Sequence, residues 1–266
     1  MKYLLEEMTW EEAGDSLKQE KIVLFPVGSI EQHGPHCPVG TDFWTAQELA
    51  RRAGEKTGIP TLPTIPMGYA QYHSDFPGTI SISKATYTEF LYEVSAQVVR
   101  WGATHILFVS GHGGNRVPCE DVGMRFRREG VLVGIVEWWH VAGHLRKEWA
   151  LIGHGDKHET SAAMCLHPDS VRLDRAKPSV HKQLSKEIDV DLGTSHFRGA
   201  PISVVLHVKD VCENGALLER GAFSDVDYSV SPAEATAAHG EEMFEVLSQY
   251  IAGFAQEFRR LQIPGR

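Results

Sequence analysis

Residues 104–115 read THILFVSGHGGN, an apolar run of strand length that ends in a glycine-rich turn around His112. The runs KIVLFPV at 21–27 and VLVGIV at 131–136 have the same character. Apolar runs of this length, bounded by turn residues, are typical of strands buried on both faces of a sheet. Helical periodicity separates them, with helices predicted at 41–57, from residue 86 to Gly102 and from about 116 to 129. This alternation indicates an α/β fold with a mainly parallel central sheet and helices on both faces.

Other segments give weaker predictions. Residues 61–67 and 202–208 have the composition of strands, although two prolines interrupt the first. Residues 86–89 and 231–234 have the spacing of capping boxes, and each predicts the start of a helix. The sequence contains no internal repeat and no Pro/Ser-rich linker. We therefore expect residues 1–266 to form one domain.

Composition excludes several classes of protein. With 42% hydrophobic and 23% charged residues the chain is expected to fold, and it has no apolar run of the length of a membrane helix. The formal net charge of -9 argues against nucleic acid or an anionic membrane as the main partner. The four cysteines form no CxxC pair, and residues 1–10 lack the apolar stretch of a secretory signal. We expect reduced thiols and a cytoplasmic protein.

The chain has 14 histidines, and several lie with carboxylates in loops that follow the predicted strands. These residues are Glu31, His33, His36 and Asp42 after the first strand, His112 after the second, Glu137 and His140 after the third, and residues 154–161 further on. Ligands of open α/β sheets bind beyond the carboxyl ends of the strands, so these side chains can converge. Carboxylates with imidazoles indicate an oxygen and nitrogen site for Zn, Mn or Fe(II) rather than a thiolate site.

Simpler interpretations compete with a metal site. Asp42 can cap the helix that follows it, and a single loop histidine is usually a turn or surface residue. We expect supporting or surface positions for His36, His140, His144 and His158. Trp138 and Trp139 fit the core as well as they fit a substrate pocket. The sequence contains no GxSxG, HExxH, GxxxxGK[ST] or GxGxxG motif, which removes the best-known alternative chemistries.

Four motifs resemble those of the creatininase (creatinine amidohydrolase) family in order and spacing. They are PVGSIEQHGPH at 26–36 with GTD at 40–42, HSDFPGT at 73–79, GHGGN at 111–115, and HGDKHETS at 154–161. The resemblance covers about residues 21–175. It implies a three-layer α/β/α fold that is often assembled as a homo-hexamer, with two divalent metal ions per chain and a small-molecule substrate.

The resemblance also implies roles for individual residues. The implied metal ligands are Glu31, His33, Asp42, His112 and Glu159, with Asp42 bridging the two ions. His154 is the implied proton donor, and His73, Asn115 and Trp139 are candidates for holding the substrate. Creatininases proper carry a ligating glutamate two residues after the histidine that corresponds to His112. Gly114 occupies this position here, which argues against creatinine itself as the substrate.

We therefore predict a metal-dependent amidohydrolase that opens a small cyclic substrate at an amide C–N bond. A bridged metal pair lowers the pKa of its shared water from about 16 toward 7 and so provides hydroxide at neutral pH. The first alternative is a hydrolase that opens a keto-inositol at a C–C bond, similar to 3-dehydro-scyllo-inosose hydrolase. The second alternative is a non-catalytic metal-binding or sugar-binding module, although a descendant without activity would be expected to have lost a ligand or His154.

Overall fold

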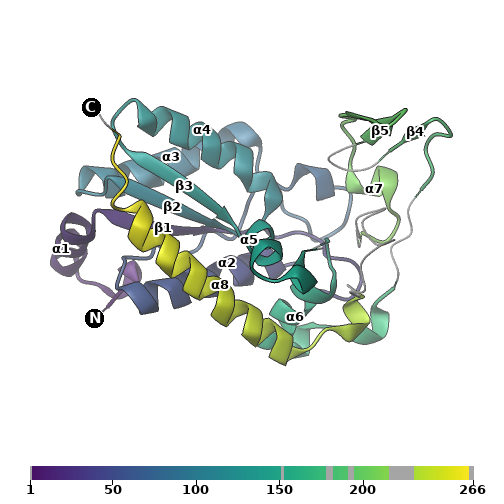
Figure 1. The fold of residues 1–266 in the computed structure, drawn as a ribbon, viewed down its shortest axis with the longest axis horizontal. Coiled ribbons are helices and arrows are strands. Elements are labelled where there is room, and N and C mark those ends of the chain that lie inside the picture. Colours follow the sequence, from purple (N-terminus) through teal and green to yellow (C-terminus); the bar gives the residue numbers. More distant parts are fainter. Residues whose placement is uncertain (1, 151–152, 178–181, 191–194, 216–230, 264–266) are drawn as a thin grey trace.

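A three-stranded parallel sheet forms the centre of the fold (Figure 1). The computed structural model describes residues 2–150, 153–177, 182–190, 195–215 and 231–263. Strands β1 (Ile22–Val27), β2 (His105–Ser110) and β3 (Leu132–Glu137) lie in the order β1-β2-β3. Val27, Ser110 and Glu137 are aligned across the sheet. All three strands therefore end at the same edge, and the loops that follow them start side by side.

Helices fill the connections as the periodicity predicts. The helices are α1 (Trp10–Glu20), α2 (Thr41–Thr57), α3 (Lys84–Arg100), α4 (Arg116–Arg127), α5 (Trp138–Leu145), α6 (Lys157–Leu166), α7 (Val208–Val211) and α8 (Ala237–Phe258). A small antiparallel sheet contains β4 (Ile188–Asp189), β5 (Ser195–Phe197) and β6 (Ala200–Ile202), and it lies away from the central sheet (Figure 1). Within the described residues, no helix is both long and apolar enough to cross a membrane.

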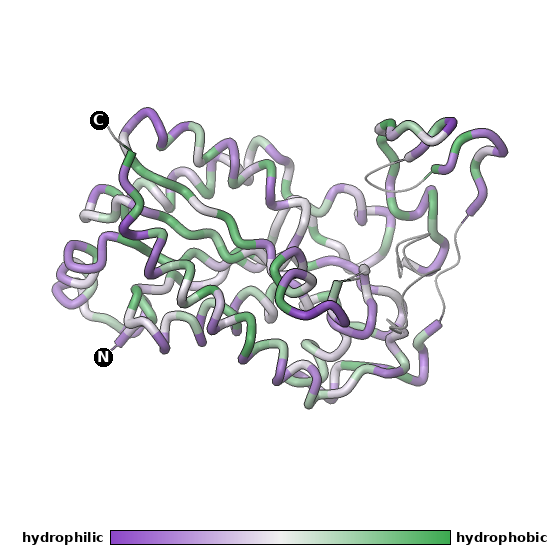
Figure 2. Tube along the Cα trace, in the orientation of Figure 1, coloured by the Kyte–Doolittle hydropathy of each residue, from purple (hydrophilic) through white to green (hydrophobic). Residues whose placement is uncertain are grey.

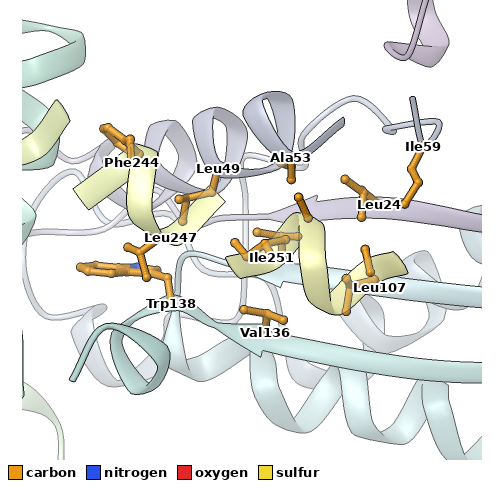
Figure 3. Packing of buried hydrophobic residues seen from close by; sticks show 14 of the residues in the cluster. Leu24, Leu49, Ala53, Ile59, Leu107, Val136, Trp138, Phe244, Leu247 and Ile251 are labelled. Atoms are coloured by element: carbon orange, nitrogen blue, oxygen red, sulfur yellow. The ribbon is translucent and has the colours of Figure 1, made fainter. Parts of the chain in front are cut away.

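Strands β1 and β2 are buried on both faces, β3 at the edge of the sheet is only partly buried over residues 132–135, and alternate residues enter different cores. Leu24, Leu107 and Val136 pack with residues of α2, α5 and α8 (Figure 3). Phe25 and Phe108 face the other way and pack with residues of α1, α3 and α4. Figure 2 shows the central strands as largely hydrophobic along their length, in agreement with this double burial. The predicted three-layer α/β/α architecture is confirmed.

Helix α8 packs closely on both α6 and α2. At Gly240 the backbones of α8 and α6 come so near that a Cβ atom would lie 2.2 Å from the carbonyl oxygen of Ser161. Two ion pairs join α8 to α2, with Arg52 at 2.7 Å from Glu241 and Lys56 at 2.9 Å from Glu245. The close approach at Gly240 places α6 directly against α8, and the ion pairs fix α8 on α2.

Two predicted strands are wrong. Residues 61–67 make only isolated bridges to β1, through Thr61 and Ile65, because the prolines at 63 and 66 have no N–H to donate to a ladder. In the 202–208 segment, β6 ends at Ile202 and α7 starts at Val208, with no strand between them.

Both capping predictions are also displaced. Helix α3 begins one turn earlier than expected, because the side chain of Ser83 accepts a hydrogen bond from the Thr86 N–H. Ser231 caps only the short 3-10 turn Pro232–Glu234, and α8 is capped by Thr236, which accepts from the His239 N–H. In both cases a second hydroxyl residue near the helix start offers an equivalent cap, and tertiary packing selects between the two.

Candidate metal centre

The implied ligands converge at the edge where the strands end. Glu31 and His33 follow β1, His112 follows β2, Asp42 is the second residue of α2, and Glu159 lies in the first turn of α6. All five residues are buried. Glu31, Asp42 and His112 form one group whose potential ligand atoms lie within 4.8 Å of one another, and His33 and Glu159 form a second such group with His154.

Glu31, Asp42 and His112 make up the first cluster. His112 Nδ1 lies 3.0 Å from Glu31 Oε2 and 3.3 Å from Asp42 Oδ2. The other ring nitrogen, Nε2, lies 3.0 Å from the carbonyl oxygen of Tyr69. Because a carbonyl only accepts hydrogen bonds, Nε2 carries the proton of the neutral ring, and Nδ1 directs a lone pair at two carboxylates. This arrangement, with a backbone carbonyl behind the imidazole, is typical of a histidine that ligates a metal.

His33 faces the carboxylates of Asp42 and Glu159, and these three residues are named the second cluster. His33 Nδ1 lies 3.0 Å from the carbonyl oxygen of Glu31, which assigns the proton of the neutral ring to Nδ1. Nε2 then faces Asp42 Oδ1 at 2.9 Å and Glu159 Oε2 at 3.5 Å. Glu159 is placed by the start of α6, where the Asp156 side chain accepts from the His158 and Glu159 N–H groups.

Asp42 belongs to both clusters, and each of its oxygens faces a different histidine. Oδ2 is buried and has no hydrogen-bond partner among the described residues. The capping interpretation is wrong, because Gly40 is the N-cap of α2 and no side-chain cap bond is present there. Acceptor atoms that face one another around a buried, unpartnered carboxylate oxygen require a cation or added protons. Carboxylate oxygens and imidazole nitrogens are a donor set that fits divalent metal ions.

The pKa values show how strongly this centre attracts positive charge. Burial opposes the charging of His33, but the carboxylates of Asp42 and Glu159 outweigh it and raise the pKa of His33 to about 10. Burial also raises the pKa of Glu159 to about 8, although the charge of His33 opposes this change. Without metal, the second cluster therefore holds protons at neutral pH.

Zinc binding is therefore expected to release protons. The affinity should rise with pH, because both pKa values lie above neutrality and protons compete with the ion for His33 and Glu159. The apparent Kd should fall up to about tenfold per pH unit for each proton displaced. Titration calorimetry in two buffers of different ionisation enthalpy measures the released protons. Binding without proton release would contradict the proposed ligand set.

The clusters form the floor of a pocket of about 650 Å³. Its wall is mainly apolar and aromatic, formed by Tyr69, Tyr72, Val117, Trp139, residues 204–206 and Val208. Trp139 and His73, two of the candidates for holding the substrate, line this pocket, whereas Trp138 is buried in the core. A pocket of this size, with an apolar wall and polar groups at one end, suits a small organic molecule.

His154 lines the same pocket. Only 14% of its side chain is exposed. Its Nδ1 atom lies 3.7 Å from Glu31 Oε1. Burial, together with the charges of His33 and His73, lowers the pKa of His154 well below its usual value. His154 is therefore neutral at pH 7.

Asn115 does not reach the pocket. It is completely buried, and its amide donates to the Gly28 carbonyl at 2.9 Å and accepts from the Tyr69 N–H at 3.1 Å. Asn115 thus positions the backbone of Tyr69, whose carbonyl orients His112. Sequence reasoning missed the part played by Tyr69, and a role carried by a backbone carbonyl leaves no side-chain signal.

Several histidines and acids of the strand-end loops lie outside the clusters. Glu137 is paired with Arg116, and His140 is largely exposed at 3.7 Å from Glu137. His36 is buried and its Nε2 lies 3.1 Å from the Thr160 hydroxyl. His158 is also buried, at 2.9 Å from His239, so of the two expected positions, supporting or surface, His36 and His158 occupy supporting ones.

Gly114 is required by close packing. A Cβ atom there would lie 2.0 Å from the Tyr69 carbonyl oxygen and 2.5 Å from His112 Nε2, the two atoms that orient this histidine. A glutamate ligand at this position is therefore incompatible with the observed backbone. We expect Gly114→Ala to displace His112 and to reduce the metal content of the purified protein.

Gly113→Ala is the matched control for this substitution. A Cβ atom at Gly113 would meet only the Trp139 ring, at an ordinary contact distance of 3.7 Å. Metal content is measured by elemental analysis of both variants. Equal, full occupancy in the two would show that the Tyr69–His112 contact is not needed for metal binding.

Comparison with known proteins identifies the family of this chain. The profile of the family described as "Creatininase: Creatinine amidohydrolase" matches residues 6–255. The chain belongs to the creatininase family. The creatininase relatives include the mycofactocin precursor peptide peptidase of Mycolicibacterium smegmatis, 31% identical over 91% of this chain and 85% of the relative. The creatinine amidohydrolase of Pseudomonas putida is 31% identical over 64% of this chain and 74% of its own. The 3-dehydro-scyllo-inosose hydrolase of Thermotoga maritima is 26% identical over 79% of this chain and 74% of its own.

Solved creatininase structures share the fold. A manganese creatininase superposes with a TM-score of 0.73 and 24% identity over 97% of this chain and 99% of its own. Another neighbour, a creatininase variant of Zn–Zn type, has a TM-score of 0.72 and 24% identity over the same shares. Members of the creatininase family are metal-dependent hydrolases, so this chain is an enzyme of that class.

Proposed function

We propose that this creatininase-family enzyme is a two-metal amidohydrolase that opens a small cyclic substrate at an amide C–N bond. The observation that carries the proposal is the pair of clusters that share Asp42, each with an imidazole lone pair directed at carboxylates. In this proposal Glu31, Asp42 and His112 hold one ion, and His33, Asp42 and Glu159 hold the other. When bound, Zn, Mn or Fe ions lower the pKa of water and polarise the carbonyl group that is attacked.

His154 handles the proton in the proposed reaction. Since it is neutral at pH 7, its Nδ1 accepts a proton from the attacking water as the new C–O bond forms. The same nitrogen then gives the proton to the leaving amide nitrogen as the C–N bond breaks. The order differs from the sequence expectation, in which His154 starts as a donor, because burial disfavours the charged ring.

The pocket wall is consistent with a ring-shaped substrate. Tyr72 and Trp139 offer aromatic surfaces in the same pocket as the clusters, and residues 204–206, from a later part of the sequence, add aliphatic surface. Flat apolar rings gain the most from such walls. His73 and Trp139 are the proposed substrate contacts, and Asn115 supports the loop behind them.

A peptide bond is the second candidate target. Two observations favour it over creatinine, namely the exclusion of any side chain at Gly114 and the 31% identity to a peptidase over most of the chain. Cleavage of a C–C bond in a keto-inositol uses the same ligands, with an enolate in place of a tetrahedral oxyanion, and stays an alternative.

The wider organisation of the protein is also part of the proposal. Residues 1–266 act as one catalytic domain in the cytoplasm, and the chains assemble as homo-oligomers. A hexamer is the expected size, and light scattering at micromolar concentration tests it. A monomer under these conditions would contradict the expected assembly.

Turnover by the metal-loaded full chain tests the proposed reaction. The panel holds cyclic amides including creatinine, formamides, a short peptide and a keto-inositol, each with Zn, Mn or Fe(II). We expect amide cleavage that a chelator abolishes and added metal restores. Cleavage of the keto-inositol alone, or full activity in protein free of transition metal, would overturn the proposal.

A further inference from the structure

Gln32 lies between two proposed ligands, Glu31 and His33, yet its side chain turns toward different partners. Its Nε2 atom lies 2.9 Å from His73 Nδ1, 3.0 Å from His154 Nε2 and 3.1 Å from the carbonyl oxygen of Gly215. Gln32 is 6% exposed. One buried amide therefore touches both pocket histidines that are outside the proposed ligand set.

Backbone groups fix which way this amide faces. The Gly34 N–H donates to Gln32 Oε1 at 2.9 Å, so this atom is the amide oxygen. The Gly215 carbonyl can only accept, so the atom that faces it is the amide nitrogen. Gly215 approaches so closely that a Cβ atom there would lie 1.9 Å from Gln32 Oε1. One of the two amide hydrogens is thus committed to Gly215, and one is left for the histidines.

The backbone of Gln32 decides which histidine receives that hydrogen. His154 Nε2 lies 2.5 Å from the carbonyl oxygen of Gln32, so Nε2 carries the proton of the neutral ring and donates it. It cannot accept from the amide as well. The free amide hydrogen therefore goes to His73 Nδ1, which must be unprotonated.

We propose that Gln32 is a positioning residue that sets opposite tautomers in the two pocket histidines. His154 is protonated at Nε2 and presents a lone pair at Nδ1. His73 accepts from Gln32 at Nδ1 and presents an N–H at Nε2, 3.7 Å from Glu31 Oε1. The role of His73 in turnover rests on the proposed hydrolysis. In that reaction its Nε2–H donates a hydrogen bond to the substrate oxygen as this oxygen becomes negative.

The same assignment separates His73 from the ligands. His73, His154 and Glu31 lie close enough to form a third candidate group for a cation. His33 and His112 have backbone carbonyls behind their rings, which leave the inner nitrogen free to ligate. His73 has an amide donor behind its ring, and its inner nitrogen is protonated. His73 is therefore a hydrogen-bond donor and not a ligand.

Gln32→Glu tests the proposal with almost no change of size. A carboxylate cannot donate to His73 Nδ1, so we expect the His73 proton to move to Nδ1 and Nε2 to become an acceptor. Imidazole ¹⁵N chemical shifts of the zinc-loaded, full-length protein report this directly, with His73→Ala and His154→Ala identifying the signals. Metal content should be unchanged, and kcat should fall by roughly 10²–10³-fold, with a much smaller change in KM.

Two further variants keep the test decisive. Gln71→Glu adds the same charge at an exposed position two residues before His73, where the Gln71 amide donates to the Ser74 hydroxyl, and should change neither the tautomer nor kcat. Gln32→Met is used if Gln32→Glu does not fold. Its side chain has no N–H to donate to His73 Nδ1, so His73 should be a mixture of tautomers. A wild-type His73 protonated at Nδ1, or an unchanged tautomer in the Gln32 variants, would overturn this inference. These spectra need no substrate, so they fail or succeed independently of the proposed reaction.

Discussion

Asp42→Asn is expected to remove at least one metal ion per chain and nearly all turnover. The substitution keeps the size of the side chain but replaces one carboxylate oxygen with an N–H group, which cannot ligate a cation. It also removes the negative charge that lies between the two clusters, where two bound cations would repel each other strongly. No other described side chain faces both His33 and His112.

The metal-free form is expected to lose stability as well. Without ions His33 is charged, because its pKa is raised to about 10, and its Nε2 lies 2.9 Å from Asp42 Oδ1. Asp42→Asn removes the carboxylate that pairs with this buried charge, so the Tm of the metal-free variant should lie below that of the metal-free wild type. The rise in Tm on addition of zinc should shrink, because that rise reports binding to the folded state.

Elemental analysis, kcat and Tm with and without zinc measure these effects. Asp121→Asn is the control, since Asp121 lies on the exposed side of α4 and pairs only with Lys84 among the described residues. Two metals per chain and near-normal turnover in Asp42→Asn would show that Asp42 is not a bridging ligand.

His154→Ala is expected to keep both metals and to lower kcat by roughly 10²–10⁴-fold, the usual contribution of a positioned acid–base group. The lost step is transfer of the proton from water to the leaving nitrogen. If His154 were instead a ligand, the same change would release metal. A surface role is already inconsistent with its position, because the ring lies over His33 with centroids 4.2 Å apart and lines the pocket.

The pH profile gives this variant a second readout. Because the pKa of His154 is lowered, the neutral ring that accepts the proton is present at pH 7 and is lost as the pH falls through that lowered pKa. Wild-type turnover should therefore decline on the acid side, and His154→Ala should lack this decline. His140→Ala, at a ring that is 68% exposed, should keep both rate and profile. An unchanged kcat in His154→Ala would end the proposed mechanism.

The sequence predicts the framework well because the framework depends on short-range patterns. The strands β1, β2 and β3 are apolar runs, β1 and β2 are buried on both faces, and the bounds of α2 agree with the predicted helix at 41–57. The errors in predicted bounds arise where two sequence signals are equally strong and tertiary packing selects between them. Ser83 and Thr86 are both good caps, and the strand-like composition of 202–208 does not reveal that β6 stops at Ile202.

The site shows a similar division. Residue types, together with the family resemblance, predict which acids and histidines lie at the strand ends, and the structure brings Glu31, His33, Asp42, His112 and Glu159 together. The sequence could not show that Gln32 reaches His73, because that contact spans 41 residues. Nor could it show that Asn115 holds backbone instead of substrate. These assignments depend on which nitrogen or oxygen faces which neighbour, and only coordinates supply that.

The packing of α8 on α6 at Gly240 affects how the enzyme is made in the cell. Glu159 is carried by α6, and α6 is covered by a helix that begins at Ala237. During synthesis the ribosome therefore releases all the proposed ligands long before the element that holds the last of them in place. We therefore expect the nascent chain to bind metal only weakly until α8 has left the ribosome and packed on α6.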